Sequence, residues 1–396
     1  MNFIFISPQF PDNYWNFSDR LRKNGVNVLG IGDAPYDGLS PQLKNALTEY
    51  YRVENMEDYD QMLRAVAFFT FKYGKIDWIE SNNEYWLGQD ARLRTDFHVT
   101  TGVNTDGIEH FRSKSAMKEC YAAAGIPTAR CHKITTKEKA AEFLKLVGYP
   151  VIVKPDIGVG ACDTWKLSNK ADFEAFFAAQ PAVPYVMEEF VTGDIRSYDA
   201  ICDSRGEPLF ESMTEWPPSI MDIVNEKKDL AYYVAAEMPE QLRKYGRAAL
   251  KAFGVKSRFV HFEFFCLTKA KKGLGKVGDF VGLEVNMRPA GAYTPDMMNY
   301  AHSIDVYQIW ADMVTADRRI FPEPESDHYC VYAGRRDIYD YVHTDEEVLA
   351  KYGADIVMYQ RMPEMSVPQM GNRMFTAHAA DEAASKEFIH FVQERK

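Results

Sequence analysis

The sequence lacks the patterns that would assign a protein to several common classes. It has only six cysteines in 396 residues, and no two of them form a CxxC pair. Zinc ribbons and dithiol redox sites need that spacing, so we expect free thiols in a reducing compartment. No run approaches 18 uncharged apolar residues, so we expect no transmembrane helix. The first basic residue is Arg20, which is too late for a secretory signal peptide. We therefore expect a cytoplasmic protein with no membrane partner.

Positive charge is scarce as well. The chain has 46 Lys and Arg against 57 Asp and Glu, and its formal net charge is −11. A nucleic-acid partner requires a basic face that replaces phosphate counterions, so we expect none. This charge still permits a local cluster of cations around one small anion. The length predicts two or three domains at roughly 150 residues each.

The first hundred residues alternate short apolar runs with helical patterns. We predict strands at 3–7, 26–31 and 76–80, and helices at 14–23, 58–73 and 86–94. Such alternation favours a parallel sheet with helices on both faces. The first strand is followed not by GxGxxG but by Ser7-Pro-Gln-Phe-Pro11. This turn argues against a nicotinamide dinucleotide site. We interpret the domain as structural, with an edge that could face a substrate.

The rest of the chain has strands joined mainly by turns. We predict strands at 151–155, 185–190, 197–202, 208–213, 258–267 and 279–286, and later helices at 344–352 and 381–395. Strands in this arrangement favour an antiparallel sheet that is distinct from the N-terminal one.

The most informative segment is Glu284-Val-Asn286-Met-Arg288-Pro289. Side chains alternate along a strand, so Glu284 and Asn286 point to the same face. A carboxylate and an amide oxygen together suit Mg²⁺, which completes its shell with water and phosphate. Arg288 follows on the same side and would place a cation within reach of an anionic group.

A further carboxylate, Glu263, stands between two phenylalanines on the preceding predicted strand. If the two strands pair, Glu263 could lie beside Glu284. Two carboxylates about 4 Å apart repel by roughly 4 kcal/mol at an intermediate dielectric, and a divalent cation would remove that conflict. A lone Glu would more often be exposed or ion-paired, but the combination with Asn286 and Arg288 favours a metal site.

Two other segments could contact a nucleotide. Lys154 ends an apolar strand and precedes a loop with Gly158 and Gly160, an arrangement that can set an ammonium and backbone N–H groups beside phosphates. It is not a Walker A motif, because the lysine precedes the glycines, and a lysine at a strand end is more often simply solvated. Near Glu188 and Val191, a strand that leaves its sheet exposes backbone groups that could hold an adenine edge.

In this order the motifs resemble the ATP-grasp superfamily of carboxylate–amine or thiol ligases. The resemblance spans nearly the whole chain, and its specific part is Glu-x-Asn-x-Arg-Pro with Glu263 upstream. The fold class it implies is α/β (α+β), an ATP-grasp fold with an N-terminal Rossmann-like pre-ATP-grasp domain. The implied divisions are a pre-ATP-grasp domain at 1–110, a small lobe with the glycine-rich loop at 111–190, a large lobe with the metal site at 191–325, and a C-terminal α+β subdomain at 326–396.

The resemblance also implies roles for individual residues. Those assigned to ATP are Lys114, Lys154, Gly158, Gly160, Ala161, Glu188, Glu189, Val191 and Asp194. The lysines would bind phosphates, the 158–161 loop would close over them, and the backbone near Glu188 would hold adenine. Asp194 stands one place before the position where the family usually binds ribose. Those assigned to Mg²⁺ or Mn²⁺ are Glu263, Glu284 and Asn286, and the residue assigned to catalysis is Arg288.

The implied reaction joins a carboxylate, from an amino acid or another small acid, to an amine through an acylphosphate, with release of ADP and phosphate. It needs no protein nucleophile. Three alternatives stay open: a carboxylase or carbamoyl-phosphate-type enzyme that uses bicarbonate, a non-catalytic nucleotide-binding module, and a nicotinamide oxidoreductase. The expected partners are a small acid and an amine, and a homodimer is compatible with this interpretation.

Two features could contribute to a substrate pocket. The stretch at 215–229 is a candidate substrate loop, although a surface loop is an equal expectation. Arg335 and Arg336 could bind a substrate carboxylate, but such basic pairs more often face solvent.

Overall fold

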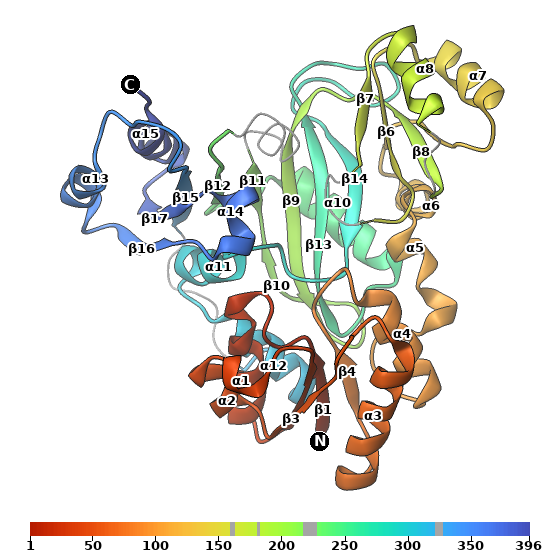
Figure 1. Ribbon diagram of the computed structural model, residues 1–396. Coiled ribbons are helices and arrows are strands. Elements are labelled where there is room, and N and C mark those ends of the chain that lie inside the picture. Colours follow the sequence, from red (N-terminus) through yellow and green to blue (C-terminus); the bar gives the residue numbers. More distant parts are fainter. Residues whose placement is uncertain (159–162, 180–182, 217–227, 321–327) are drawn as a thin grey trace.

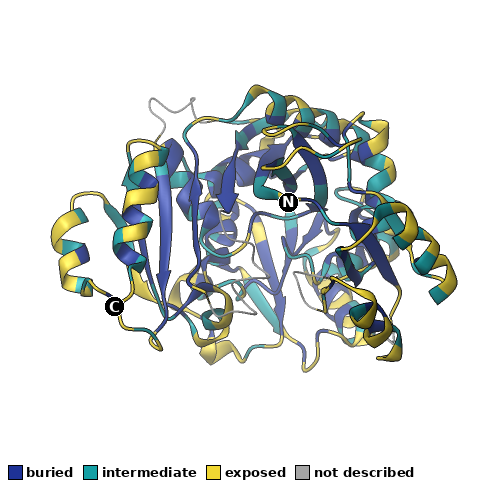
Figure 2. Ribbon diagram, turned by 90° about the horizontal axis from the view of Figure 1, so that it is seen from above, coloured by how far each residue is buried: buried dark blue, intermediate teal, exposed yellow. Residues whose placement is uncertain are grey.

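The computed structural model describes residues 1–158, 163–179, 183–216, 228–320 and 328–396, and its strands form three sheets (Figure 1). The sheets follow one another along the chain. Figure 1 shows the first at the bottom, the second at the upper right and the third across the middle to the left. Figure 2 shows that most strands are buried, whereas the outer faces of the helices are exposed. Across the described ranges, no helix has the length and hydrophobicity needed to span a bilayer.

The first sheet is parallel, as predicted, with the strand order β3-β2-β1-β4. Its strands are β1 (Asn2–Ile6), β2 (Asn27–Gly32), β3 (Glu49–Arg52) and β4 (Trp78–Glu80). Its helices are α1 (Trp15–Lys23), α2 (Pro41–Ala46), α3 (Tyr59–Tyr73) and α4 (Leu87–Asp96), with 3₁₀ turns η1 (Asp12–Tyr14) and η2 (Tyr36–Gly38). The sequence did not predict β3, because its four residues contain no apolar run.

Both faces of this sheet are buried. Along β1, Phe3 and Phe5 point to one side and contact Trp310 of α12 (Val306–Ala316). Ile4 and Ile6 point to the other side and join a cluster with the apolar residues of α3. A helix from residues 306–316 therefore helps to complete the core of the N-terminal domain.

The second sheet is small and antiparallel, with the order β5-β8-β6-β7. Its strands are β5 (Cys131–Lys133), β6 (Val151–Pro155), β7 (Trp165–Leu167) and β8 (Tyr185–Glu189). The helices of this region are α5 (Glu109–Arg112), α6 (Lys114–Ala123), α7 (Lys137–Val147) and α8 (Lys170–Ala178), with the 3₁₀ turn η3 (Thr105–Gly107). Apolar residues of α7 and α8 pack on this sheet and close its core.

The third sheet is antiparallel and has nine strands. In spatial order they are β14 (Phe280–Asn286), β13 (Arg258–Leu267), β9 (Gly193–Cys202), β11 (Thr214–Trp216), β12 (Ala231–Val234), β15 (Tyr329–Arg335), β17 (Arg373–Ala379) and β16 (Ile356–Arg361), with β10 (Pro208–Ser212) also paired to β9. The other helices are α10 (Glu240–Phe253), α11 (Thr294–His302), α13 (Asp345–Tyr352), α14 (Val367–Met370) and α15 (Glu382–Gln393), with η4 (Glu364–Ser366). The pairing of β12 with β15 carries the sheet across the predicted boundary between residues 325 and 326.

Alternation along the middle of β9, β13 and β14 gives this part of the sheet an apolar face and a face with a group of polar residues. Tyr198, Phe262 and Phe264 lie in a core cluster with apolar residues of α6 and α10. The residues between them carry polar side chains on the opposite face. Opposite the Glu263–Phe264 step, β14 holds the extra residue Leu283, which makes a β-bulge beside that face. The polar face holds the candidate site.

Helix α10 lies against β9 so closely that a side chain at Gly246 has no room. A Cβ there would lie 2.2 Å from Cγ of the buried Tyr198 ring. We expect Gly246→Ala to lower the free energy of unfolding by about 1–3 kcal/mol, as overpacked core substitutions do. Urea unfolding followed by circular dichroism measures this. Gly38→Ala, where an added Cβ meets nothing within 4 Å, is the control, and equal losses in both variants would contradict the prediction.

Candidate functional site

The strand pair that carries the predicted metal ligands forms as expected. On β13 and β14, Glu263 lies directly opposite Glu284, and His261 lies opposite Asn286. Directly opposed side chains in an antiparallel pair share a face, so the two carboxylates point the same way. Like charges in such positions destabilise a sheet unless cations compensate them.

Cations do gather around this pair. Burial alone would raise the pKa of Glu263, but the hydrogen bond from His261 and the charges of His261, Arg288 and Lys154 hold that pKa below its usual value. Nδ2 of Asn286 is buried and, among the described residues, has no hydrogen-bond partner. Arg288 follows β14 directly, and its Nη1 donates to the Pro289 carbonyl at 2.7 Å.

These side chains fit a magnesium or manganese ion. The set consists of two carboxylates and one amide, and Mg²⁺ binds through one or two carboxylates together with substrate phosphates. The described part of the chain has no cluster of three or more His, Cys, Asp or Glu side chains arranged around a metal. The fit therefore depends on nucleotide phosphates for the remaining ligands, and the assignment of Glu263, Glu284 and Asn286 stays a prediction.

Behind Glu263 lies a polar array that sequence reasoning missed. Nδ1 of His261 is 2.6 Å from Asp199 Oδ1, and its Nε2 is 3.2 Å from Glu263 Oε1. Burial alone would lower the pKa of His261, but the Asp199 charge and the hydrogen bonds to both carboxylates raise it to about 9. The signal available in the sequence was the His-x-Glu alternation on the predicted strand.

Lys154, near the end of β6, lies close enough to Glu263 and Glu284 to interact with them electrostatically, but it is ion-paired with another carboxylate. Its Nζ lies 2.8 Å from Glu188 Oε2, and Nζ of Lys118 lies 2.8 Å from Glu188 Oε1. Burial would raise the pKa of Glu188, but the two ammonium groups lower it to about 2. Lys118 also donates to the Leu283 carbonyl at 3.2 Å. Sequence analysis missed Lys118, whose signal was its spacing of one helical turn from Lys114.

Lys114 is the first residue of α6 and lies at the base of the glycine loop. Its Nζ donates to the Gly158 carbonyl at 3.0 Å, and its backbone N–H donates to the Asp156 carbonyl at 2.8 Å. Gly158 is the last described residue before the loop, and the predicted nucleotide contacts Gly160 and Ala161 lie outside the described residues.

The segment after β8 joins the two lobes. The Glu189 carboxylate accepts hydrogen bonds from the backbone N–H and Nη2 of Arg130, at 2.8 and 2.7 Å, and lies 3.2 Å from Lys271 Nζ. Its side chain is thus engaged by the protein.

Val191 follows and packs in a small apolar cluster; the other buried members are Ala129, Leu267, Leu274 and Val281. The backbone N–H and C=O of Val191 make no hydrogen bond within the described ranges. Asp194 lies on β9 opposite Cys266.

Known proteins resemble this chain in fold. No protein-family model matches the chain. Over 179 residues, 45% of the chain, it is 24% identical to an L-arginine-specific L-amino acid ligase of Bacillus subtilis, and this match covers 42% of the relative. The chain thus matches less than half the length of that relative. An L-amino acid ligase structure from Bacillus licheniformis is 15% identical with a TM-score of 0.70, covering 99% of this chain and 96% of the other.

A second solved structure is a biotin carboxylase domain of the Hydrogenobacter thermophilus 2-oxoglutarate carboxylase, in complex with MgADP, ADP and bicarbonate. It is 15% identical with a TM-score of 0.70, covering 98% of this chain and 88% of the other. These proteins belong to the ATP-grasp superfamily, and both structural likenesses extend over nearly the whole chain. The chain has the ATP-grasp fold.

The segment after β4 contacts the segment that follows β14. Glu84 follows β4 and accepts a hydrogen bond from the Met287 N–H at 3.2 Å. Burial raises the pKa of Glu84 above its usual value, and this effect outweighs the charges of Arg288 and Arg258, which lower that pKa. Asn82 is fully buried in a left-handed conformation (φ 52°), and neither atom of its amide has a partner among the described residues. The sequence predicted a structural domain with an edge that could face a substrate, but not these residues.

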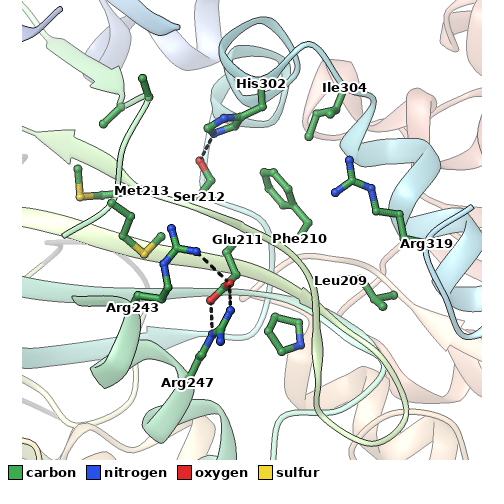
Figure 3. Close-up of a pocket in the computed structure, with 14 residues that line it drawn as sticks. Leu209, Phe210, Glu211, Ser212, Met213, Arg243, Arg247, His302, Ile304 and Arg319 are labelled. Carbon is green, nitrogen blue, oxygen red and sulfur yellow. Dashed lines mark hydrogen bonds and ion pairs between the residues drawn. The ribbon is translucent and has the colours of Figure 1, made fainter. Parts of the chain in front are cut away.

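A pocket of about 380 Å³ lies elsewhere, between β10, α10 and the end of α11 (Figure 3). Arg243 and Arg247 point into it and both pair with Glu211. None of the predicted site residues lines it.

The sequence offered two further features for a substrate pocket, a candidate loop and a pair of arginines, and the structure treats them differently. The candidate loop lies largely at 217–227, outside the described residues. Arg335 and Arg336 are buried, so the expectation that they face solvent is wrong. Arg335 pairs with Asp345 at 2.8 Å, and Arg336 donates to three backbone carbonyls, including that of Val367. Both guanidinium groups are thus held by groups of the folded chain, although Nη2 of Arg335 has no hydrogen-bond partner among the described residues.

The Glu188 cluster makes stability depend on pH in a defined direction. Glu188 has a lowered pKa, so its contribution is present above its ordinary value of 4.5 and is lost as the pH falls toward 2. We expect Glu188→Gln to lower the free energy of unfolding at pH 7 by about 3 kcal/mol and to flatten its decline below pH 4.5.

Urea unfolding between pH 3 and pH 7 measures both effects. Glu346→Gln, on an exposed side chain, is the matched control. A Glu188→Gln variant that loses stability below pH 4.5 as steeply as the wild type would refute the role given to this carboxylate.

Proposed function

We propose that this ATP-grasp chain is an ATP-dependent ligase that activates a small carboxylate as an acylphosphate and joins it to an amine. The observation that carries this proposal is the direct opposition of Glu263 and Glu284, with Asn286 on the same face and Arg288 just beyond it. Two opposed carboxylates can bind a divalent cation that also contacts phosphate groups. In a sheet with a purely structural role they would only repel each other and lower its stability.

The positive groups on the other side of the cleft support the same activity. Lys114 and Lys154 come from the small lobe, and both are buried. We propose that they bind the nucleotide phosphates, with Lys118 as a third cation. The metal held by Glu263, Glu284 and Asn286 would supply positive charge against the phosphate oxygens. The apolar cluster around Val191, with its free backbone groups, is the proposed adenine site.

The proposed chemistry needs positioning and charge rather than a protein nucleophile. The substrate carboxylate attacks the γ-phosphorus, and the bond from that phosphorus to the β–γ bridging oxygen breaks, so that ADP leaves. Arg288 holds the phosphoryl group during this transfer. The amine nitrogen then attacks the acyl carbon and loses a proton, and inorganic phosphate leaves. An amino acid is the favoured acid, because both the curated relative and one structural neighbour are L-amino acid ligases.

A second candidate is a ligase that uses bicarbonate in place of an organic acid. It is favoured by the likeness to a carboxylase domain solved with bicarbonate. Both candidates use the same nucleotide and metal residues, so only the carboxyl substrate distinguishes them.

Products of the reaction test the proposal directly. The full chain is incubated with ATP, Mg²⁺ and pairs of amino acids, and we expect ADP and phosphate in equal amounts together with a dipeptide. Chromatography of the nucleotides and mass spectrometry of the products measure this. AMP and pyrophosphate as products would exclude the acylphosphate route. Phosphate release that requires bicarbonate and no organic acid would favour the second candidate.

The metal assignment has its own test. We expect Glu284→Gln to lower ATP turnover by about 100-fold or more, because it removes a charge that would hold the metal against the phosphates. Circular dichroism and the thermal midpoint should change little. Glu346→Gln serves again as the exposed control, and a fully active Glu284→Gln variant would remove Glu284 from the site.

A further inference from the structure

A continuous row of polar side chains ends on one of the predicted metal ligands. The Thr214 backbone N–H donates to Ser197 Oγ at 3.0 Å, and Ser197 Oγ donates to Asp199 Oδ2. The other oxygen of Asp199 lies 2.6 Å from His261 Nδ1, and His261 Nε2 lies 3.2 Å from Glu263 Oε1. The row therefore runs across β11, β9 and β13 and stops at the candidate site.

The pairing of the strands fixes this row. On β9 and β13, Asp199 lies directly opposite His261, and Ser197 lies directly opposite Glu263. Ser197, Asp199 and His261 are buried, and the Trp216 ring packs edge-on against the imidazole with centroids 5.5 Å apart. Both ring nitrogens face carboxylate oxygens, so a rotation of the imidazole would break two contacts at once.

His261, at the end of the row, hydrogen-bonds to the Glu263 carboxylate. It contacts Oε1, whereas no protein group within the described ranges hydrogen-bonds to Oε2. Glu284 lies opposite and repels the same carboxylate. Without a fixed donor on Oε1, the Glu263 side chain could rotate away from Glu284, and the two carboxylates would no longer face one cation. Groups that orient metal ligands in this way commonly change metal affinity 10- to 100-fold when removed.

We propose that His261 is a positioning residue for the metal site: its Nε2–H holds Glu263 so that Oε2 faces the cation shared with Glu284, and Asp199 fixes the imidazole for that task. This inference rests on the proposed function, because it takes Glu263 as a metal ligand.

A matched pair of substitutions separates positioning from packing. In His261→Gln the amide nitrogen reaches close to the position of Nε2, so the donor to Glu263 is kept. In His261→Asn the amide nitrogen reaches close to the position of Nδ1, so the contact to Asp199 is kept and the donor to Glu263 is lost. A role in packing alone would make the shorter and longer amides differ in stability but not in metal affinity.

The measurement is the affinity of the full chain for Mn²⁺ in the presence of ADP, read from the electron paramagnetic resonance signal of free Mn²⁺. We expect His261→Asn to weaken Mn²⁺ binding about 10- to 100-fold and His261→Gln to weaken it only about threefold or less. Glu263→Gln is measured alongside and should weaken binding at least as much as His261→Asn. In turnover assays, the Mg²⁺ requirement should rise in the same order.

The outcomes distinguish the role of His261 from the assignment of Glu263 as a metal ligand. Weak binding in Glu263→Gln with normal binding in His261→Asn would overturn the role of His261 and leave the proposed function standing. Normal binding in Glu263→Gln would overturn the metal assignment, and the inference with it. Equal weakening by His261→Asn and His261→Gln would also overturn the inference. If His261→Asn does not fold, Asp199→Asn replaces it, with an expected weakening smaller than that of Glu263→Gln.

Discussion

The opposition of Glu263 and Glu284 is the constraint around which the rest of the site is arranged. Two carboxylates on one face of neighbouring strands repel, and the surroundings supply the compensation. His261 approaches from within the sheet, Arg288 from the loop after β14, and Lys154 from the facing lobe. The two carboxylates are thus compensated by cations from their own sheet and by a lysine from the second sheet. In the proposed complex, the nucleotide phosphates would face the lysines and the metal ion would face the carboxylates.

The part of this site that the sequence could predict is the part that depends on local geometry. Glu284 and Asn286 share a face because strand side chains alternate with a period of two, and no knowledge of the remaining chain is needed. The opposition of Glu263 could be predicted only on the condition that the strands pair in that register. The bulge at Leu283 has no signal in the sequence, yet it sets the carbonyl that Lys118 contacts.

The contacts that escaped prediction depend on tertiary structure. Lys118 was missed because its partner Glu188 lies 70 residues away on another element. Glu189 was expected to contact the nucleotide, and its carboxylate is instead held by Arg130 and Lys271, which come from different lobes. The burial of Arg335 escaped prediction for the same reason, because the carbonyl and carboxylate that neutralise it come from α15 and α13. The N-terminal domain was correctly predicted as a parallel sheet, whereas its contact with Met287 through Glu84 could not be read from its own residues.

The pairing of β12 with β15 has a mechanical consequence. It makes the strands of the candidate site and the C-terminal strands parts of one hydrogen-bonded sheet. The second sheet is separate, and among the described residues the one isolated bridge to the third sheet joins Thr128 to Gly282. Because the second sheet lies outside this ladder, a change in its position relative to the nine strands would break no ladder hydrogen bond between them. The ion pair between Lys271 and Glu189 joins the two parts, so such a change would have to break it.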